Sequence, residues 1–407
     1  MRRLYFANFN RTHRARAGPV HLVDISLFYP AHTGGVRTYL RAKSRWLRQR
    51  TRLRHSIVAP AVRGDEAAGE APDLVAIPSF PIPFGQGFRW PVSPAMATRR
   101  LLSLQPHLIE VGDPYQFAWC ALRARDRLNI QALAFYHSDL SQLAAHRFGR
   151  FGQLAADTYL RRLYTQFDLV LAPSRTSLEK LQSLGILQAR QQPLGVDTAL
   201  FAPDRRERWL RRQLGLPANS RLLVYAGRYS REKNLPALIN AVEILGKPYH
   251  LLLIGCGTLR SLGLSGSQPV RSGLVSCLPY QREAGVLASL IGGCDVFVHP
   301  GQHETFGLVV LEAMACGLPV LGVAGGGVSE LIDSETGLLV ESGSSAALAE
   351  GIQAIFATDL RALGQRGRQK VVSAYAWDKI MPQLMQHYEN LSGSGWAMPG
   401  EMATLSP

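Results

Sequence analysis

The sequence has few cysteines, no long apolar run and almost no acidic residues near its start. Five cysteines occur in 407 residues, and no two of them are spaced as Cys-x-x-Cys. This number and spacing exclude a disulfide framework and a zinc site. No segment approaches the roughly 18 uncharged apolar residues that span a bilayer. The basic start, residues 1–17, lacks the apolar run of a secretory signal, so a cytosolic protein is expected.

Basic residues are distributed unevenly along the chain. The formal net charge is +15, and residues 1–195 hold 27 of the 45 Lys and Arg but only 12 of the 30 Asp and Glu. Residues 196–407 hold 18 of each sign. The first half should therefore meet an anionic partner, such as phospholipid, nucleic acid or an acidic substrate. A basic surface that only keeps the protein soluble is the alternative.

Short apolar runs alternate with helical segments over most of the sequence. Strands are expected at 20–28, 55–60, 74–77, 108–111, 131–136 and 168–172, and then again at 221–226, 249–254, 295–299, 319–323 and 337–340. Alternation of strand and helix predicts parallel sheets with helices on both faces. The fold class expected is α/β, with two doubly wound, Rossmann-like domains facing a central cleft. Ligands of such folds bind at the carboxyl ends of the strands.

The domain organisation follows from where this pattern stops and restarts. We expect five segments: a flexible basic tail at 1–18, a first domain at 19–194, a second domain at 195–376, a helix at 377–391 that crosses back to the first domain, and a loose tail at 392–407.

A loop that leads into a helix carries two glutamates. A strand is predicted to end at His299, and a helix to begin near Phe306 or Gly307. The free amides and positive dipole of a helix N-terminus suit a phosphate. Glu304 lies in the loop and Glu312 in the helix, where carboxylates can accept hydrogen bonds from sugar hydroxyls. The alternative is that both are ordinary polar residues of a loop and a helix.

Three further segments place polar or flexible residues at the ends of predicted strands. Arg228 and Lys233 follow the first strand of the second half, and two cations there can neutralise a diphosphate leaving group. His137 follows a strand of the first half and would face them across the cleft. Gly34 and Gly35 precede a helix and let the backbone approach a ligand closely. Each signal is weak alone, because most single cations are solvated and most single histidines are structural.

Together these segments resemble the retaining glycosyltransferases of family 4, which have the GT-B fold. Their order is Gly-Gly near the start, a histidine in the first half, Arg-x4-Lys at the opening of the second domain and Glu-x7-Glu later. Residues 192–203 look like the family's interdomain signature, with Leu194 where asparagine is usual. Residues 316–322 and 325–330 match as well, with Ser329 where proline is common.

The resemblance implies a role for each candidate residue. Arg228 and Lys233 would bind the donor diphosphate. Glu304 would hold the donor sugar, and Glu312 the nucleotide ribose. His137 would lie beside the transferred sugar.

The resemblance also implies donor contacts made mainly by the backbone. These are expected at Gly34, Gly35, Thr305, Phe306, Gly307 and Leu308. The family works without a bound metal, and this chain has no Asp-x-Asp motif for a Mg2+ or Mn2+ clamp. The two cations and the helix dipole would supply positive charge instead. No metal and no other cofactor is therefore expected.

The expected function is a retaining, metal-independent hexosyltransferase that uses a nucleotide-diphosphate sugar. The first domain usually holds the acceptor in this fold and here carries the whole charge excess. A lipid or lipid-linked glycan at the inner membrane face is therefore the favoured acceptor, with the protein peripheral on an anionic membrane surface. The basic helix after Gly35 and the segment 147–151 both mix cations with aromatics, as interfacial surfaces do.

Three alternatives to this function stay open. The acceptor could be soluble or a polysaccharide, or the protein could be a nucleotide-sugar epimerase of the same fold. The charge alone would suit a nucleic-acid-binding protein, but no binding module for nucleic acid is recognisable, so no nucleic acid is expected among the partners.

Overall fold

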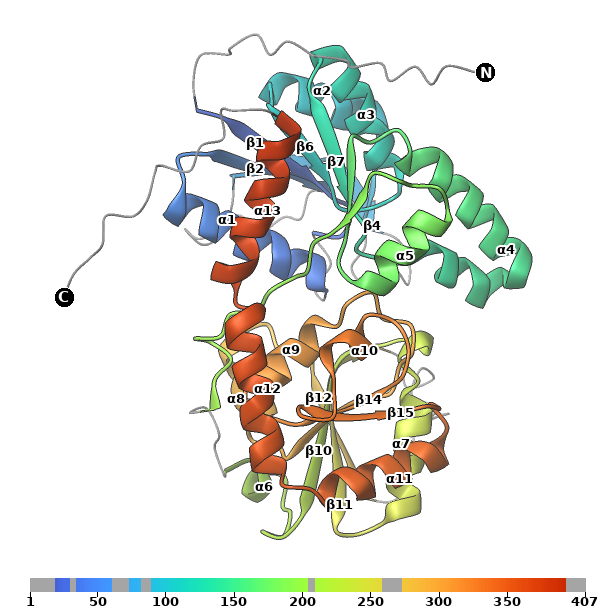
Figure 1. Ribbon diagram of the computed structural model, residues 1–407, viewed down its shortest axis with the longest axis vertical. Helices are drawn as coiled ribbons and strands as arrows, with labels where there is room; N and C mark the ends of the chain where they lie inside the picture. The colour runs from blue at the N-terminus through green and yellow to red at the C-terminus, as the bar shows by residue number, and fades with distance from the viewer. Residues whose placement is uncertain are drawn as a thin grey trace, which may run out of the picture.

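A computed structural model describes residues 19–29, 34–60, 73–81, 89–203, 209–257 and 273–392 of the chain. The chain forms two domains, each built on a parallel β-sheet with helices packed against it, and they lie one above the other in Figure 1. The expected tails, 1–18 and 392–407, lie outside the described residues except for Ser392, which ends a helix.

The first domain is built on a sheet of seven parallel strands in the order β3-β2-β1-β6-β7-β8-β9. Its strands are β1 (His21–Ile25), β2 (Arg54–Pro60), β3 (Asp73–Ile77), β6 (Leu108–Val111), β7 (Gln131–Phe135), β8 (Leu169–Ala172) and β9 (Ala189–Gln191). Its helices are α1 (Gly35–Arg50), α2 (Pro94–Leu104), α3 (Gln116–Leu128), α4 (Leu140–Tyr164) and α5 (Arg175–Ser183). A short antiparallel hairpin joins β4 (Ser79–Pro81) to β5 (Arg89–Pro91). The central strands are buried because α1 covers one face of the sheet and α2 and α3 cover the other.

The second domain is built on a sheet of six parallel strands in the order β12-β11-β10-β13-β14-β15. Its strands are β10 (Arg221–Tyr229), β11 (Tyr249–Gly257), β12 (Val275–Pro279), β13 (Val296–His299), β14 (Val320–Val323) and β15 (Gly337–Val340). Its helices are α6 (Trp209–Gln213), α7 (Leu235–Leu245), α8 (Ala284–Gly292), α9 (Leu308–Ala315), α10 (Val328–Leu331), α11 (Ser345–Phe356) and α12 (Leu360–Ala374). A single 3-10 turn spans Arg231–Lys233.

Both sheets reverse their strand order once, between β1 and β6 and between β10 and β13. At such a point the loops that leave the two neighbouring strands run in opposite directions and open a crevice for ligands. Gly34 and Gly35 follow β1, Arg228 lies at the end of β10, and Glu304 follows β13. The topology therefore places these residues at the two switch points.

Strand β10 is longer than the apolar pattern predicts, because it continues through Arg228 to Tyr229. The partner strand β11 places Gly255 opposite Gly227 and Gly257 opposite Tyr229. A Cβ at Gly255 would lie 1.8 Å from the Gly227 carbonyl oxygen, so only glycine permits this close pairing. Arg228 therefore belongs to a strand and not to the loop that the sequence suggests.

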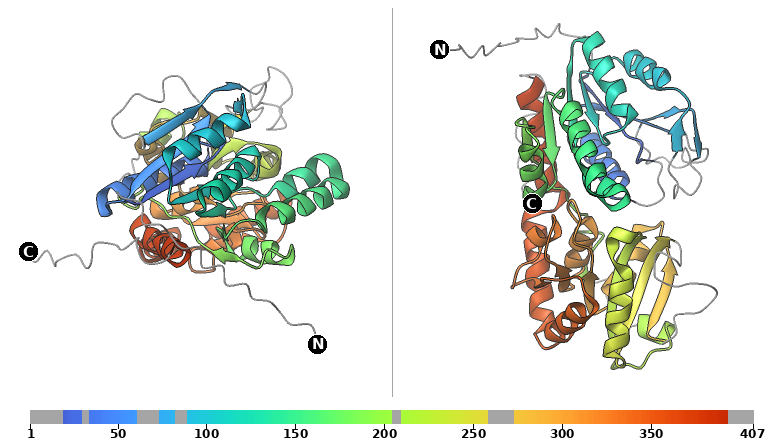
Figure 2. Two further views of the ribbon diagram at one scale, coloured as in Figure 1. Left: turned by 90° about the horizontal axis from the view of Figure 1, so that it is seen from above. Right: turned by 90° about the vertical axis from the view of Figure 1, so that its right-hand side faces the viewer.

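The chain passes twice between the domains. The first passage leaves β9, and the second joins α12 to the last helix, α13 (Trp377–Ser392). The two passages pair through a bridge between Val196 and Ala376. Helix α13 then runs alongside the first domain, as Figure 1 and the right view of Figure 2 show, and packs on α1.

A buried polar cluster connects α13 to the first sheet. The Lys43 ammonium lies 2.7 Å from Asp24 Oδ1, 2.9 Å from Glu110 Oε1 and 3.1 Å from the Tyr388 hydroxyl. All four side chains are almost completely buried. Buried charges are stable only when they are paired and hydrogen-bonded, so the position of α13 is set by the charges of α1, β1 and β6.

Candidate active site

Two helix N-termini, one from each domain, meet at the domain interface. Helix α1 begins after Gly34, whose φ is +151°, and α9 begins after Gly307, whose φ is +100°. A Cβ at Gly35 would approach Leu308 Cδ1 to 2.8 Å, so the two helix starts are in contact. The first amides of a helix have no helical acceptor and carry the positive end of its dipole. The convergence of two such ends makes a candidate anion site that neither domain has alone.

Lys233 and Glu304 form an ion pair beside this anion site. The Lys233 ammonium donates to Glu304 Oε2, and His299 Nε2 lies 3.5 Å from the same oxygen. Burial alone would raise the pKa of Glu304, but Lys233 and His299 outweigh it and hold the pKa well below its usual range. Glu304 is therefore a fixed negative charge. His299 is missed by sequence reasoning, although its place at the end of β13 was visible.

Arg228 and Glu312 lie on the same side of the interface and are unpaired. Within the described residues, neither side chain forms a salt bridge, and burial is the one cause that shifts the pKa of Glu312. Burial raises the pKa of Glu312 to about 8, so its carboxyl group is mostly neutral at pH 7. Tyr280, which follows β12 and was not predicted, has a raised pKa mainly because of burial, and it lies near both Arg37 and Glu312. A polar group that is partly buried and unpaired is available to a ligand.

His137 reaches the interface from the first domain. Its ring stacks in parallel on Phe135, with 4.2 Å between ring centroids, and lies 5.2 Å from the ring of Tyr39. Burial, reinforced by the charge of Lys43, lowers the pKa of His137 to about 3. Its Nε2 is buried without a hydrogen-bond partner among the described residues. His137 is therefore a neutral imidazole with one ring nitrogen free to meet a hydroxyl group.

The two domains are held together by hydrogen bonds that the sequence did not predict. Thr305 Oγ1 donates to the His137 carbonyl oxygen at 3.1 Å, and Ser177 Oγ donates to the Thr305 carbonyl oxygen at 3.4 Å. The Glu330 carboxylate accepts from the amides of Arg175 and Thr176 at 2.8 and 2.7 Å. Glu330 thus caps α5 from the opposite domain, where a carboxylate is favoured by the helix dipole.

The predicted site residues do not all face the interface. Gly35 lies against Leu308, and Thr305 donates to the His137 carbonyl oxygen across the interface. Lys233 pairs with Glu304 within the second domain. The side chain of Phe306 instead packs in the core, with its ring 6.2 Å from that of Tyr375. Phe306 therefore presents only its backbone to a ligand.

A cavity of about 420 Å³ opens beside this site, between α4 and the second domain. It is lined by His146 of the first domain and by Arg231, Glu232, Asn234, Pro300, Gln302, His303, Glu341, Ser342, Gly343 and Ser344 of the second. The ring centroids of His146 and His303 are 5.5 Å apart. The lining residues include sequence neighbours of Lys233 and Glu304, so the cavity lies next to the segments that carry the ion pair, although neither of these two side chains lines it.

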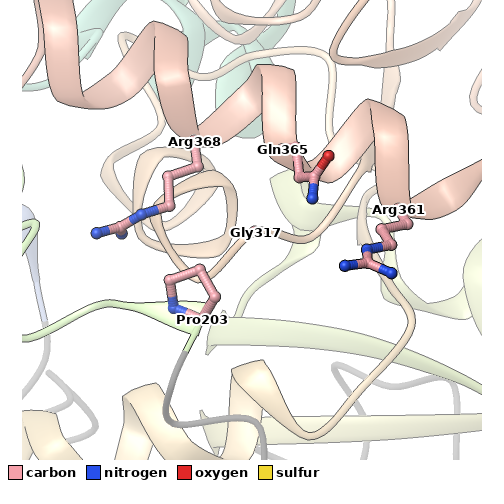
Figure 3. A pocket seen from close by; sticks show the side chains of 5 residues that line it. All are labelled: Pro203, Gly317, Arg361, Gln365 and Arg368. Carbon is pink, nitrogen blue, oxygen red and sulfur yellow. The ribbon is translucent and has the colours of Figure 1, made fainter.

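A second cavity, of about 480 Å³, contains none of the predicted site residues (Figure 3). It lies at the opposite end of α9, between Gly317 and the α12 side chains Arg361, Gln365 and Arg368. The Arg368 guanidinium donates to the carbonyl oxygens of Phe201 and Thr198 and to that of Ala315. It therefore fixes the interdomain passage and is not free to bind a donor.

Metal-binding groups are not concentrated at this interface. In the part of the chain that the structure describes, no three His, Cys, Asp or Glu side chains gather where they could hold a metal ion. The positive charge near the anion site comes from Arg228, Lys233 and the two helix starts.

Two parallel α/β domains with opposed strand ends are the architecture of a GT-B glycosyltransferase. Residues 207–370 match the family Glycosyl transferases group 1, and residues 33–200 match Glycosyltransferase Family 4. A GDP-mannose-dependent alpha-mannosyltransferase of Mycobacterium tuberculosis is 30% identical over 296 residues, covering 72% of this chain and 76% of that protein. The chain therefore belongs to the family 4 glycosyltransferases, as its motifs predicted.

Other relatives cover more of the chain at lower identity. A GDP-mannose-dependent alpha-(1-6)-phosphatidylinositol dimannoside mannosyltransferase of the same species is 25% identical over 374 residues, covering 90% of this chain and 95% of that protein. The sucrose-phosphate synthase of Thermosynechococcus elongatus superimposes with a TM-score of 0.74 at 24% identity, covering 92% of this chain and all of that one. Anabaena HepE in complex with UDP-glucose superimposes with a TM-score of 0.75 at 21% identity, covering 91% of this chain and all of that one. These likenesses confirm the GT-B fold.

Proposed function

We propose that this glycosyltransferase moves a hexosyl group, with retention of configuration and without a metal, from a nucleotide-diphosphate sugar to a lipid or lipid-linked glycan. The donor site is supported by the contact between the α1 and α9 N-termini and by the pairing of Lys233 with Glu304 in the loop before α9. The proposed acceptor is supported by the two mycobacterial relatives. Both names give GDP-mannose as the donor, and one of them also names phosphatidylinositol dimannoside. The basic first domain supports work at the inner membrane face.

The donor diphosphate would lie between the two helix starts. Lys233 has three N–H donors, so it can keep its bond to Glu304 and bind a phosphate oxygen as well. Glu304, fixed in its ionised form, would accept from hydroxyls of the donor sugar. Glu312 would accept from the ribose. Arg228 would neutralise the second phosphate.

The reaction would proceed on one face of the sugar. As the bond from C1 to the diphosphate oxygen breaks, negative charge grows on the diphosphate, where the helix dipoles and the two cations stabilise it. The acceptor oxygen forms its bond to C1 from the same side, and its proton passes to the departing diphosphate oxygen. The neutral His137 would hold a hydroxyl of the transferred sugar through Nε2, which orients C1 toward the acceptor.

Binding and transfer assays test the donor and the acceptor separately. Calorimetry with GDP-, UDP- and ADP-sugars in EDTA should detect binding of at least one of them, with GDP-mannose the first choice. Labelled sugar should then appear in phosphatidylinositol or its mannosides dispersed in detergent, with the anomeric configuration of the donor. A strict need for Mg2+ or Mn2+ contradicts the metal-free reaction, and an inverted product contradicts the retaining one. Labelling of a soluble glycan alone would replace the lipid acceptor.

A further inference from the structure

Helix α4 exposes apolar side chains that no other described element covers. Leu143, Phe148, Phe151 and Leu154 have exposed fractions of 44, 68, 87 and 59%. We call these four residues the α4 patch. Helix α4 projects sideways from the first domain in Figure 1 and in the left view of Figure 2. An isolated exposed leucine is ordinary, but two phenylalanines and two leucines on one helix indicate a surface that binds something apolar.

Basic residues are interleaved with the α4 patch. Arg147 and Arg150 are both exposed, and the stretch 140–156 has no Asp or Glu. Within the described residues neither arginine forms an ion pair, and the Arg147 guanidinium lies 5.9 Å from the centroid of the Phe148 ring. Gly149, with φ +62° and ψ −153°, breaks the helical conformation between the two phenylalanines. Aromatic rings for the acyl boundary, with cations for headgroups beside them, suit an anionic lipid surface.

The α4 patch lies next to the mouth of the active site. Helix α4 begins three residues after His137, at Leu140. About 12 Å of helix separates Leu140 from Phe148 at 1.5 Å per residue. His146, two residues before Phe148, lines the cavity that adjoins Lys233 and Glu304. A bilayer held against the α4 patch would therefore present its headgroups to that cavity.

Helix α1, the other basic segment of the first domain, lacks these features. Its apolar residues Tyr39, Leu40, Trp46 and Leu47 are buried in the core. Arg45 lies 3.6 Å from Asp197, and Arg50 lies 3.7 Å from Asp378. None of the exposed large apolar residues of the described chain lies on α1, so its exposed face offers no such side chain for insertion.

We propose that the α4 patch, with Arg147 and Arg150, is the surface by which this protein docks on an anionic lipid bilayer, and that it delivers the acceptor headgroup to the cavity beside Lys233. The inference deepens the proposed function and rests on its lipid acceptor. No described helix is long and apolar enough to cross a membrane, so this docking would be peripheral.

Vesicle binding by substituted proteins tests the docking surface. The probes are vesicles of phosphatidylcholine with and without phosphatidylglycerol, sedimented at low and high salt. Phe148→Ser with Phe151→Ser should lower the partition onto mixed vesicles at least about tenfold, because two exposed rings no longer enter the interface. Arg147→Gln with Arg150→Gln should weaken binding only to vesicles with phosphatidylglycerol, and salt should reproduce that loss.

The control variants replace exposed apolar residues on the second domain, Ile244→Ser and Val372→Ser. They should bind vesicles as the wild type does. All variants should bind the nucleotide sugar normally, which also shows that they fold. Normal vesicle binding by the variant with Phe148→Ser and Phe151→Ser overturns the proposal. Loss of vesicle binding in Arg41→Glu on α1, or in Phe80→Ser on the β4–β5 hairpin, overturns it as well. If size-exclusion chromatography shows a dimer that this variant dissociates, the patch binds a second copy instead.

The transfer assay separates this inference from the proposed function. If the protein glycosylates a lipid dispersed in detergent but ignores all vesicles, the docking surface is wrong and the lipid acceptor stands. If it binds vesicles through α4 but glycosylates no lipid, the docking surface stands and the proposed acceptor is wrong.

Discussion

At the scale of single residues, Lys233 and Glu304 act as one unit. Their side chains are only 15 and 23% exposed, and each is the other's closest opposite charge. Removing Lys233 leaves a partly buried carboxylate with only His299 beside it, which destabilises the site. A change at either position should therefore affect both donor binding and local stability.

We predict that Lys233→Ala and Glu304→Gln each reduce transfer by about 30- to 1000-fold, which corresponds to roughly 2–4 kcal/mol of lost transition-state stabilisation. The double variant should be more stable than Lys233→Ala alone, with a coupling free energy of about 1–3 kcal/mol. Urea unfolding of the four proteins measures the coupling. Strictly additive unfolding free energies, or near-normal turnover in both single variants, would show that the pair has no such role.

Glu312 should make donor binding depend on pH. Burial raises the pKa of its carboxyl group to about 8 in the free protein. Ribose hydroxyls that donate to it favour the ionised form, so the complex has a lower pKa. Binding near pH 7 should therefore release a proton, and affinity should rise with pH up to about 8.

Calorimetry with a nucleotide sugar, in two buffers that differ in ionisation enthalpy, measures this proton release. Glu312→Gln keeps the shape of the side chain and should abolish the release and flatten the pH dependence. Proton uptake by the wild type, or an unchanged pH profile in the variant, would be incompatible with a ribose contact through the carboxylate.

At the scale of helices and strands, Glu330 couples the second domain to α5 of the first. Its carboxylate accepts from two backbone amides and from the Thr176 hydroxyl, at 2.7 to 2.9 Å. These bonds exist only when the two domains are close together. They should therefore favour the closed arrangement without stabilising either domain alone.

We predict that Glu330→Ala raises the KM for the nucleotide sugar by roughly five- to thirtyfold, because the lost cap is worth about 1–2 kcal/mol. The melting temperature should change little. Small-angle scattering should show a larger radius of gyration. Glu335→Ala, an exposed carboxylate on the following turn, is the control. An unchanged radius with an unchanged KM would mean that Glu330 does not hold the domains closed.

The strands that the sequence predicted are those with continuous apolar runs, because burial between two layers of helices requires them. β6 and β15 were predicted with their observed bounds. β9, with the sequence Ala-Arg-Gln, has no apolar run and was missed. The end of β10 was missed because its pairing depends on Gly255 of another strand.

The candidate site was predictable as a set of residues but not as a set of contacts. Arg228, Lys233, Glu304 and Glu312 were proposed from spacings that are local in sequence, and their roles in donor binding stay predictions. The bonds from Thr305 to His137 and from Glu330 to α5 join residues more than 150 positions apart. Such contacts depend on how the two domains pack, which local patterns do not specify.

At the scale of the whole molecule, Tyr388 is the residue that fixes the last helix to the first domain. Its hydroxyl donates to Glu110 and accepts from Lys43 at 3.1 Å, in a fully buried position. Tyr388→Phe removes the hydroxyl, so Lys43 and Glu110 each lose one hydrogen bond. Unsatisfied buried partners are costly, so stability should fall.

We predict that Tyr388→Phe lowers the free energy of unfolding by about 1–3 kcal/mol. Hydrogen exchange should accelerate selectively at the amides of α13. Tyr280→Phe, at a partly exposed tyrosine, should leave both measurements unchanged. If Tyr388→Phe unfolds like the wild type and α13 keeps its protection, the apolar contacts alone anchor this helix.

The same return of α13 sets the order in which the domains are finished during synthesis. When β9 leaves the ribosome, the first sheet is whole but Lys43 and Glu110 have no partner hydroxyl from Tyr388. Roughly 200 more residues must be translated, which takes roughly 10–40 seconds at ordinary rates. The second domain, whose last strand ends at Val340, can fold in that interval. The domain that begins first is thus completed last, and Lys43 and Glu110 of the nascent chain stay without these hydrogen bonds until α13 is made.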